Sequence, residues 1–262
     1  RGAYVNYEAQ WHRLSGGRAP ALQALLEGAS FGGTLGTAGT LRSSAVVQRS
    51  GGATRATRLD TTWAHEDPER LASLRLGDTI SQPGSWGRAV RYGGLQWSTD
   101  FSLQPGFVSL AAPVLHGEAA LPSTVDVYVD NVRRMQGRVE AGSFQLPDVP
   151  VVNGRGEVRM VVRDLLGREQ VVVQPYHASA ALLRPGLRSV SAEAGLLREG
   201  YGVDSGRYGS AFAAYGDRLG VDAGFTREWR VEWSARRRAL GASGSFLLPG
   251  GTTALARAAA SE

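Results

Sequence analysis

The feature that most constrains the fold is a two-residue alternation of apolar and polar side chains. In the segment AYVNYEAQWHRL (3–14), the odd positions are apolar or aromatic, and the even positions include Asn6, Glu8 and Gln10. A period of two is that of an extended strand with one apolar and one polar face. Similar alternation recurs within the segments 41–48, 57–64, 70–79, 88–97, 219–228 and 230–236. The sequence therefore predicts an all-β, antiparallel fold.

The length of these segments bears on where the sheet lies. Each runs for about ten residues, or about 33 Å along a strand. Tilted by about 45°, such a strand crosses an apolar band about 25 Å tall, whereas soluble strands usually have about five or six residues. The length favours a transmembrane β-barrel segment, here a partial one. The chain has no run of eighteen apolar residues, so no transmembrane helix is predicted.

The polar face gives a second argument for a membrane wall. A wide barrel in lipid is apolar outside and polar inside, the reverse of a small soluble barrel. On this interpretation the candidates that line the pore are Asn6, Glu8, Gln10, Arg58, Asp60, Asp222 and Glu228. A soluble antiparallel sandwich with one wetted face produces the same alternation, so the pattern alone leaves both interpretations open.

The middle of the chain has a different character. Between residues 112 and 178 the segments are shorter and their apolar faces are rich in valine, as in TVDVYV (124–129) and EVRMVV (157–162). Such β-branched cores are typical of a small sandwich. We therefore expect barrel strands over 1–111, an inserted sandwich over 112–178 and further barrel strands over 179–262. The candidate linker residues are Pro113, Gly117, Pro175 and Pro185.

The sequence carries no recognisable catalytic or metal-binding motif. It has no cysteine, and none of its four histidines is spaced from another as metal ligands are. HExxH and GxSxG motifs are absent. The net charge of +5 comes from arginines that are spread along the chain among acids, a pattern that does not favour nucleic-acid binding. We therefore expect no enzyme activity, no cofactor, no metal and no nucleic-acid partner.

Several segments, taken in order, resemble one known family. The stretch GDTISQPGSWGRAVRYGGLQWSTDFSLQPGF (77–107) and the start RGAYVNYEAQW resemble the barrel of the outer-membrane fimbrial ushers of the chaperone–usher pathway. ALPSTVDVYVDN, VEAGSFQLPDVP and GEVRMVVRDLLGRE are similar to the usher plug, and QPYHASAALLRPGLRSVSAEAG is similar to the return from plug to barrel. The resemblance covers most of the chain, and its last thirty residues match less distinctly.

The resemblance implies a function. Ushers are pores in the bacterial outer membrane that translocate and assemble pilus subunits delivered by periplasmic chaperones, and a plug domain closes the lumen at rest. This chain would hold about six barrel strands, the plug and several later strands of a longer protein. The lipid bilayer and chaperone–subunit complexes are the implied partners, and a homodimer is left open. The charged plug residues Asp126, Arg133, Arg134, Arg159 and Arg163 become candidates for gating through contacts with lumen charges such as Glu8 or Asp60.

Two other classes of protein remain as alternatives. One is a soluble β-sandwich adhesin or binding protein without a pore, which would be monodisperse without detergent. The other is a hydrolase whose site is spread across several strands, because chemistry assembled between strands leaves no local motif.

Overall fold

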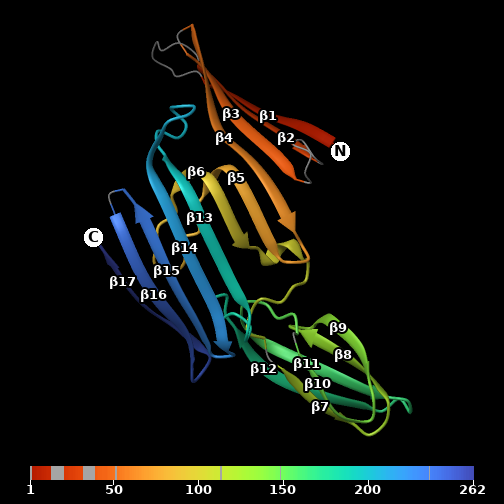
Figure 1. Cartoon of the computed structure of the whole chain (residues 1–262). Helices are drawn as coiled ribbons and strands as arrows, with labels where there is room; N and C mark the ends of the chain where they lie inside the picture. The colour runs from red at the N-terminus through yellow and green to blue at the C-terminus, as the bar shows by residue number, and fades with distance from the viewer. Residues whose placement is uncertain are drawn as a thin grey trace.

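The computed structural model describes residues 2–12, 21–31, 39–50, 52–112, 114–147, 149–235 and 237–262. In these ranges the chain forms seventeen strands and one three-residue 3₁₀ helix, η1 (Phe101–Leu103). The strands make three antiparallel sheets (Figure 1). The predicted all-β antiparallel class is confirmed.

The largest sheet, which we call the wall, has eleven strands in the order β1-β2-β3-β4-β5-β6-β13-β14-β15-β16-β17. The first six are β1 (Gly2–His12), β2 (Ala21–Phe31), β3 (Thr40–Ser50), β4 (Ala53–Asp67), β5 (Ala72–Ile80) and β6 (Arg91–Thr99). The other five are β13 (Arg188–Arg198), β14 (Tyr208–Asp222), β15 (Phe225–Ser234), β16 (Arg237–Leu248) and β17 (Thr252–Ser261). These strands have 9 to 15 residues, the length that a tilted membrane strand requires.

A small two-sheet domain, which we call the insert, lies in sequence between β6 and β13. One of its sheets has the order β12-β11-β8-β9, and the other pairs β10 with β7. Its strands are β7 (Leu115–Ala119), β8 (Ser123–Val129), β9 (Val132–Val139), β10 (Gly142–Leu146), β11 (Gly154–Asp164) and β12 (Glu169–Ala178). The wall continues through the interruption, because β6 and β13 are hydrogen-bonded neighbours.

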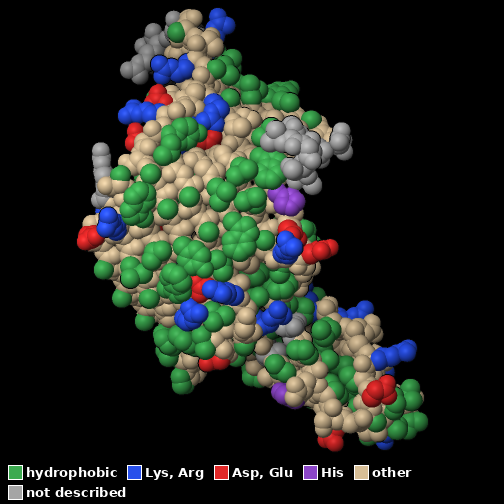
Figure 2. All heavy atoms as spheres, viewed as in Figure 1, with side chains coloured by type: hydrophobic (Ala, Val, Ile, Leu, Met, Phe, Trp, Pro, Cys, Tyr) green, Lys and Arg blue, Asp and Glu red, His purple; other side chains and the backbone are tan. Residues whose placement is uncertain are grey.

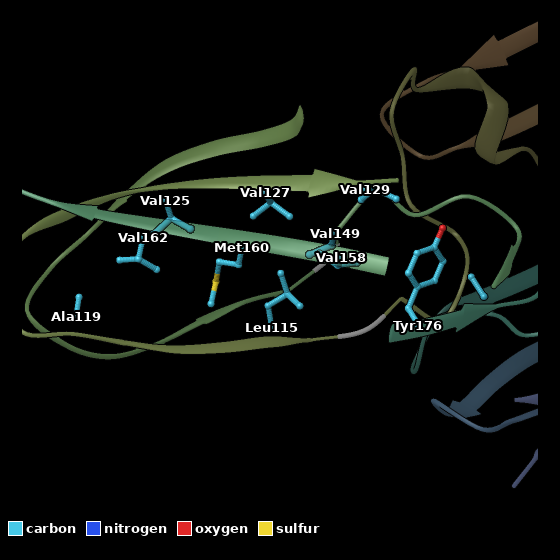
Figure 3. Packing of buried hydrophobic residues seen from close by; sticks show 11 residues of the cluster. Leu115, Ala119, Val125, Val127, Val129, Val149, Val158, Met160, Val162 and Tyr176 are labelled. Atoms are coloured by element: carbon cyan, nitrogen blue, oxygen red, sulfur yellow. The ribbon is translucent and has the colours of Figure 1, made fainter. Parts of the chain in front are cut away.

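The insert has a dry core of its own (Figure 3). Alternate residues of β8 point inward, so Val125, Val127 and Val129 are almost completely buried. Leu115 of β7 and Met160 of β11 close the core from the two sheets. Each fully buried side chain of this size contributes about 1.5–3 kcal/mol, so the insert holds enough buried apolar surface to be a stable unit.

Two linkers run side by side between the insert and the wall. The N–H of Ala111 donates to the carbonyl of Leu182 at 3.1 Å, and the N–H of Arg184 donates to the carbonyl of Ser109 at 2.9 Å. The N–H of Leu183 donates to the hydroxyl of Thr226 on β15 at 2.8 Å. This pairing fixes the base of the insert at one end of the wall, which we call the insert end (Figure 1).

The predicted linker residues fall differently from expectation. Pro185 lies between β12 and β13, as a linker should, and Pro113 is outside the described residues. Gly117 is instead in β7, where a Cβ atom would lie 2.3 Å from the Phe144 ring, so packing explains this glycine. Pro175 is in β12, an edge strand, where the missing N–H of proline is tolerated.

An irregularity between β3 and β4 changes which side chains share a face. The register pairs Ala45 with Arg58 and Ser43 with Thr61, and it shifts between them. The extra residue reverses the alternation within β4. The expectation that Leu59 lies opposite Asp60 is therefore wrong: both line the same cleft. Arg58 lies in register with Ala45, on the face opposite Thr57 and Val46.

Candidate functional site on the inner face of the wall

The two faces of the wall differ in character. We call the face that carries Glu193 and Arg230 the inner face, and the opposite one the outer face. On β1 of the outer face, Tyr7 is 80% and Trp11 62% exposed. Other exposed apolar residues in register on the outer face are Leu76, Leu95, Trp97, Leu196, Val231, Trp233 and Leu240. Figure 2 shows few charged side chains over β13 to β16. An apolar surface this broad is typical of a membrane contact.

The inner face carries a buried network of charges. The Arg230 side chain is 1% exposed and donates from Nε to Glu232 Oε1 at 2.7 Å and from Nη2 to Glu193 Oε2 at 3.2 Å. The same Glu193 accepts from the backbone N–H of Gln82 at 2.7 Å. Because buried charges require partners, Glu193 binds both Arg230 and Gln82. The network thus joins β13 and β15 to the segment between β5 and β6.

That segment, the 81–90 loop, lies on the inner face. The N–H and the hydroxyl of Ser85 both donate to Glu228 Oε1, at 2.7 and 2.9 Å. Nη1 of Arg257 on β17 donates to the carbonyl oxygen of Ser85 at 2.7 Å. The loop therefore reaches across the wall from β5 to β17, held by side chains of four strands, β13, β15, β16 and β17.

Two glycines permit this close approach. Gly84 has φ of +64°, and a Cβ atom there would lie 2.5 Å from Glu228 Oε1. Gly241 faces the ring of Trp86, and its Cβ atom would lie 2.3 Å from that ring. Side chains at these two positions would push the loop away from the wall.

A second loop, 199–207, joins β13 and β14 at the end of the wall away from the insert. The N–H of Arg58 on β4 donates to Ser205 Oγ at 3.1 Å, and its guanidinium binds Asp78 and Tyr208. The hydroxyl of Tyr201 donates to Asp60 at 2.9 Å. The 199–207 loop therefore joins the early strand β4 to the late strands of the wall.

Most of the predicted pore-lining residues lie on or beside the inner face. Glu8 and Gln10 line a cleft of about 300 Å³. Asn6 is in register with Glu27, which lines a second, neighbouring cleft. Asp60 lines that second cleft, of about 770 Å³, and is 3.3 Å from Nη1 of Arg91. Glu228 binds the 81–90 loop.

Two of the predicted pore-lining residues do not lie as expected. Asp222 is the last residue of β14, where its carboxylate accepts from the N–H of Gly224 in the following turn at 2.7 Å. Arg58 points to Asp78, as described above. The alternation could not locate the turn or the β-bulge that moves these two side chains.

The charged residues predicted on the insert remain at its surface. Asp126 pairs with Arg133 at 3.8 Å, Arg163 pairs with Glu169, and the Arg159 guanidinium lies 4.5 Å from the centre of the Tyr128 ring. Arg134 is exposed on β9. Asp60, a predicted lumen partner, is bound by Tyr201 of the wall.

The insert touches the wall at residues that the sequence did not single out. Nη2 of Arg155 donates to the carbonyl oxygen of Gly250 at 2.7 Å, in the turn between β16 and β17. Nε2 of His177 lies 3.1 Å from Thr253 Oγ1. The inner-face residues Glu193 and Arg230 were also missed. The sequence signal that could have indicated this site is the 81–90 loop, which is long and contains one proline, two glycines and a tryptophan.

The described residues offer no group of three His, Asp or Glu side chains arranged to hold a metal ion. No helix in the described ranges is long and apolar enough to cross a membrane.

Comparison with known proteins identifies the family. Residues 34–250 match the family model of the outer membrane usher protein. The usher LpfC of Salmonella typhimurium (strain LT2) is 31% identical over 146 residues, and the F1 capsule-anchoring protein of Yersinia pestis is 30% identical over 125 residues. These matches cover 55% and 48% of this chain, but 17% and 15% of the two relatives.

A solved structure supports the same fold. In a P pilus tip assembly intermediate of E. coli containing PapC, PapD, PapK and PapG, the similar chain has a TM-score of 0.62 and 20% identity. The match covers 99% of this chain and 32% of that one. The long strands, the apolar outer face and the insert agree with this assignment. The chain belongs to the outer membrane usher protein family, and its wall is part of an outer-membrane β-barrel.

Proposed function

We propose that this chain is the gated part of an outer-membrane pore that translocates and assembles chaperone-delivered pilus subunits. The observation that carries the proposal is the insertion of a self-contained sandwich between two hydrogen-bonded wall strands, β6 and β13. A domain placed this way can move as one body while the wall stays closed, because no hydrogen bond between wall strands has to break.

The insert is the proposed plug, with domain limits of 112–178 between wall segments 1–111 and 179–262. In the structure it lies beyond one end of the wall (Figure 1), where Arg155 contacts the β16–β17 turn and His177 contacts Thr253 at the start of β17. We interpret this arrangement as the displaced, open state of the plug. Gating through Asp126, Arg133, Arg134, Arg159 and Arg163 stays a proposal for the closed state.

The inner face suits the passage of a folded protein. Its carboxylates and guanidiniums are largely paired with one another, as in Glu193 with Arg230, so a passing subunit meets polar groups that are already satisfied. Such a surface offers few strong attachment points. The pore-lining roles of Asn6, Glu8, Gln10, Asp60 and Glu228 belong to this proposal.

The partners follow from the family. The similar solved structure is a pilus assembly intermediate, and the proposed partners of this chain are chaperone–subunit complexes and the lipid bilayer. The chain spans less than a fifth of the curated relatives reported above, so recruitment of these partners involves the longer protein. A homodimer remains a proposal. We propose transport and assembly without catalysis.

Conductance of the full-length protein in planar lipid bilayers tests the gate. The protein should show low conductance at rest, and deletion of residues 112–178 should raise it, because the lumen then has no stopper. A matched control is a variant that keeps the insert but carries Arg207→Gln, at the opposite end of the wall. Unchanged conductance after the deletion would contradict the gate.

A further inference from the structure

Three charged residues lie together on the outer face near the insert end. Asp217 of β14 is in register with Val190 and Trp229 of the neighbouring strands. Its side chain is 0% exposed and binds the Arg188 guanidinium, and Nη1 of Arg227 lies 3.1 Å from its Oδ1. We call Arg188, Asp217 and Arg227 the outer triad.

The register places the triad on the outer face. Arg188 and Arg227 both pair with Leu219, two residues beyond Asp217, so the three charged side chains share one side of the sheet. Arg218 and Glu228, which pair with each other across 4.0 Å, belong to the inner row. The triad therefore faces the same surroundings as the apolar outer residues.

The charge of the triad is unbalanced. Two guanidiniums share one carboxylate, which leaves one net positive charge on an otherwise apolar surface. The Arg188 and Arg227 side chains remain 56% and 42% exposed. Asp222, the nearest acid along β14, is used by its own turn through the N–H of Gly224. A charge at the surface of a membrane wall is costly unless an anion joins it.

The depth of the triad indicates where that anion comes from. Arg188 is the first residue of β13, and Arg227 is the third residue of β15, so both lie at the insert end of the wall. Beside them the rings of Tyr215 and Trp229 pack with centroids 5.2 Å apart. Aromatic side chains of this kind mark the headgroup level of a membrane protein.

The loops indicate which leaflet this is. The two longest connections between consecutive wall strands, 81–90 and 199–207, leave the strands at the other end of the wall. At the insert end, β4–β5, β14–β15 and β16–β17 are joined by four, two and three residues. Outer-membrane barrels have short periplasmic turns and longer extracellular loops. The insert end is accordingly the periplasmic one.

We propose that Arg188 and Arg227 form a binding site for the headgroup of an anionic phospholipid in the periplasmic leaflet. The two forked guanidiniums would bind the phosphate oxygens, as arginine does at phosphate sites. Asp217 holds both arginines in place from beneath, and it is a positioning residue. The proposal rests on the membrane location of the wall and is independent of pilus assembly.

Native mass spectrometry of the full-length protein in detergent tests the site, with dioleoylphosphatidylglycerol as the probe. We expect the variant R188Q/R227Q to bind this lipid about 25-fold more weakly, about fivefold for each arginine. R188K/R227K keeps the charge and should lose less. R207Q is the matched control, because Arg207 pairs with Glu199 in a loop at the opposite end, and its lipid affinity should equal that of the native protein.

Three outcomes would overturn the proposal. Equal affinity of the native protein and R188Q/R227Q, with both shown to be folded by heat-modifiable gel migration, would exclude the arginines. Equal affinity for dioleoylphosphatidylcholine would exclude selection for an anionic lipid. Full displacement of the lipid by excess inorganic phosphate would identify free phosphate as the ligand.

Discussion

The Cβ atom of His177 lies 3.4 Å from the position that a Cβ atom would occupy at Gly251. These two residues belong to the insert and to the β16–β17 turn of the wall. Together with the bond from Arg155 to Gly250, they define where the insert contacts the wall.

This proximity can be tested with a disulfide. Bridged cysteines have Cβ atoms about 3.5–4.5 Å apart, and the chain has no native cysteine. We expect His177→Cys with Gly251→Cys to cross-link in the full-length protein and to hold the conductance high until a reductant is added.

The control pairs Gly251→Cys with Leu165→Cys, which lies at the far tip of the insert beyond β11. This second pair should not cross-link. Equal cross-linking of both pairs, or none with His177→Cys, would contradict the docking site.

The second prediction concerns the inner charge network. Arg230→Gln leaves the buried Glu193 and the half-buried Glu232 without their cation, and breaking a buried ion pair such as Glu193–Arg230 costs about 3–5 kcal/mol. The 81–90 loop, which Glu193 also holds, should loosen. We expect the temperature at which the full-length barrel loses its folded gel mobility to fall. Arg207→Gln, at an exposed pair, should leave it unchanged, and an unaltered transition in Arg230→Gln would argue against the network.

The third prediction concerns the core of the insert. Met160→Ala removes a fully buried side chain between the two sheets and should destabilise the insert by about 2–5 kcal/mol. Chemical denaturation of the segment 112–178, which we expect to fold independently, measures this. Val171→Ala, at an exposed position of β12, is the control and should have a small effect. A segment that shows no cooperative unfolding would refute the independence of the insert.

The fourth prediction is a dependence on pH in the β11–β12 turn. Burial raises the pKa of Asp164, but bonds from Arg168 and from backbone N–H groups outweigh this and hold the pKa below the ordinary 3.8. A carboxyl whose pKa is lowered by folding stabilises the folded state at pH values above its ordinary pKa. This stabilisation is lost as the pH falls through the lowered pKa. Denaturation of the segment 112–178 measures this. At neutral pH, the native segment should have a higher free energy of unfolding than the Asp164→Asn variant. The difference should shrink below pH 3.8, and a difference independent of pH would contradict this role.

Sequence alone predicted the elements and not their contacts. Alternation placed Tyr7 and Trp11 on the apolar face, because a regular strand keeps its period. It failed for Leu59, where a β-bulge reverses the period, and for Asp222, where the strand ends in a turn.

The contacts between distant segments were outside the reach of periodicity. Glu193 and Arg230 meet because β13 and β15 flank β14 in register, and Arg155 meets Gly250 because of how the insert is placed. Both depend on pairing between strands far apart in sequence, which a local pattern does not encode.

The central claim is that the wall is apolar toward lipid and polar toward a water-filled lumen. Tyr7 and Glu8 are neighbours on β1 with opposite faces, so single cysteines at these positions in the full-length protein test it most directly. In lipid vesicles, a water-soluble maleimide should label Glu8→Cys quickly and Tyr7→Cys slowly. A fluorophore attached at residue 7 should be quenched by brominated lipid, and one at residue 8 should not. Equal labelling and equal quenching at the two positions would contradict the claim.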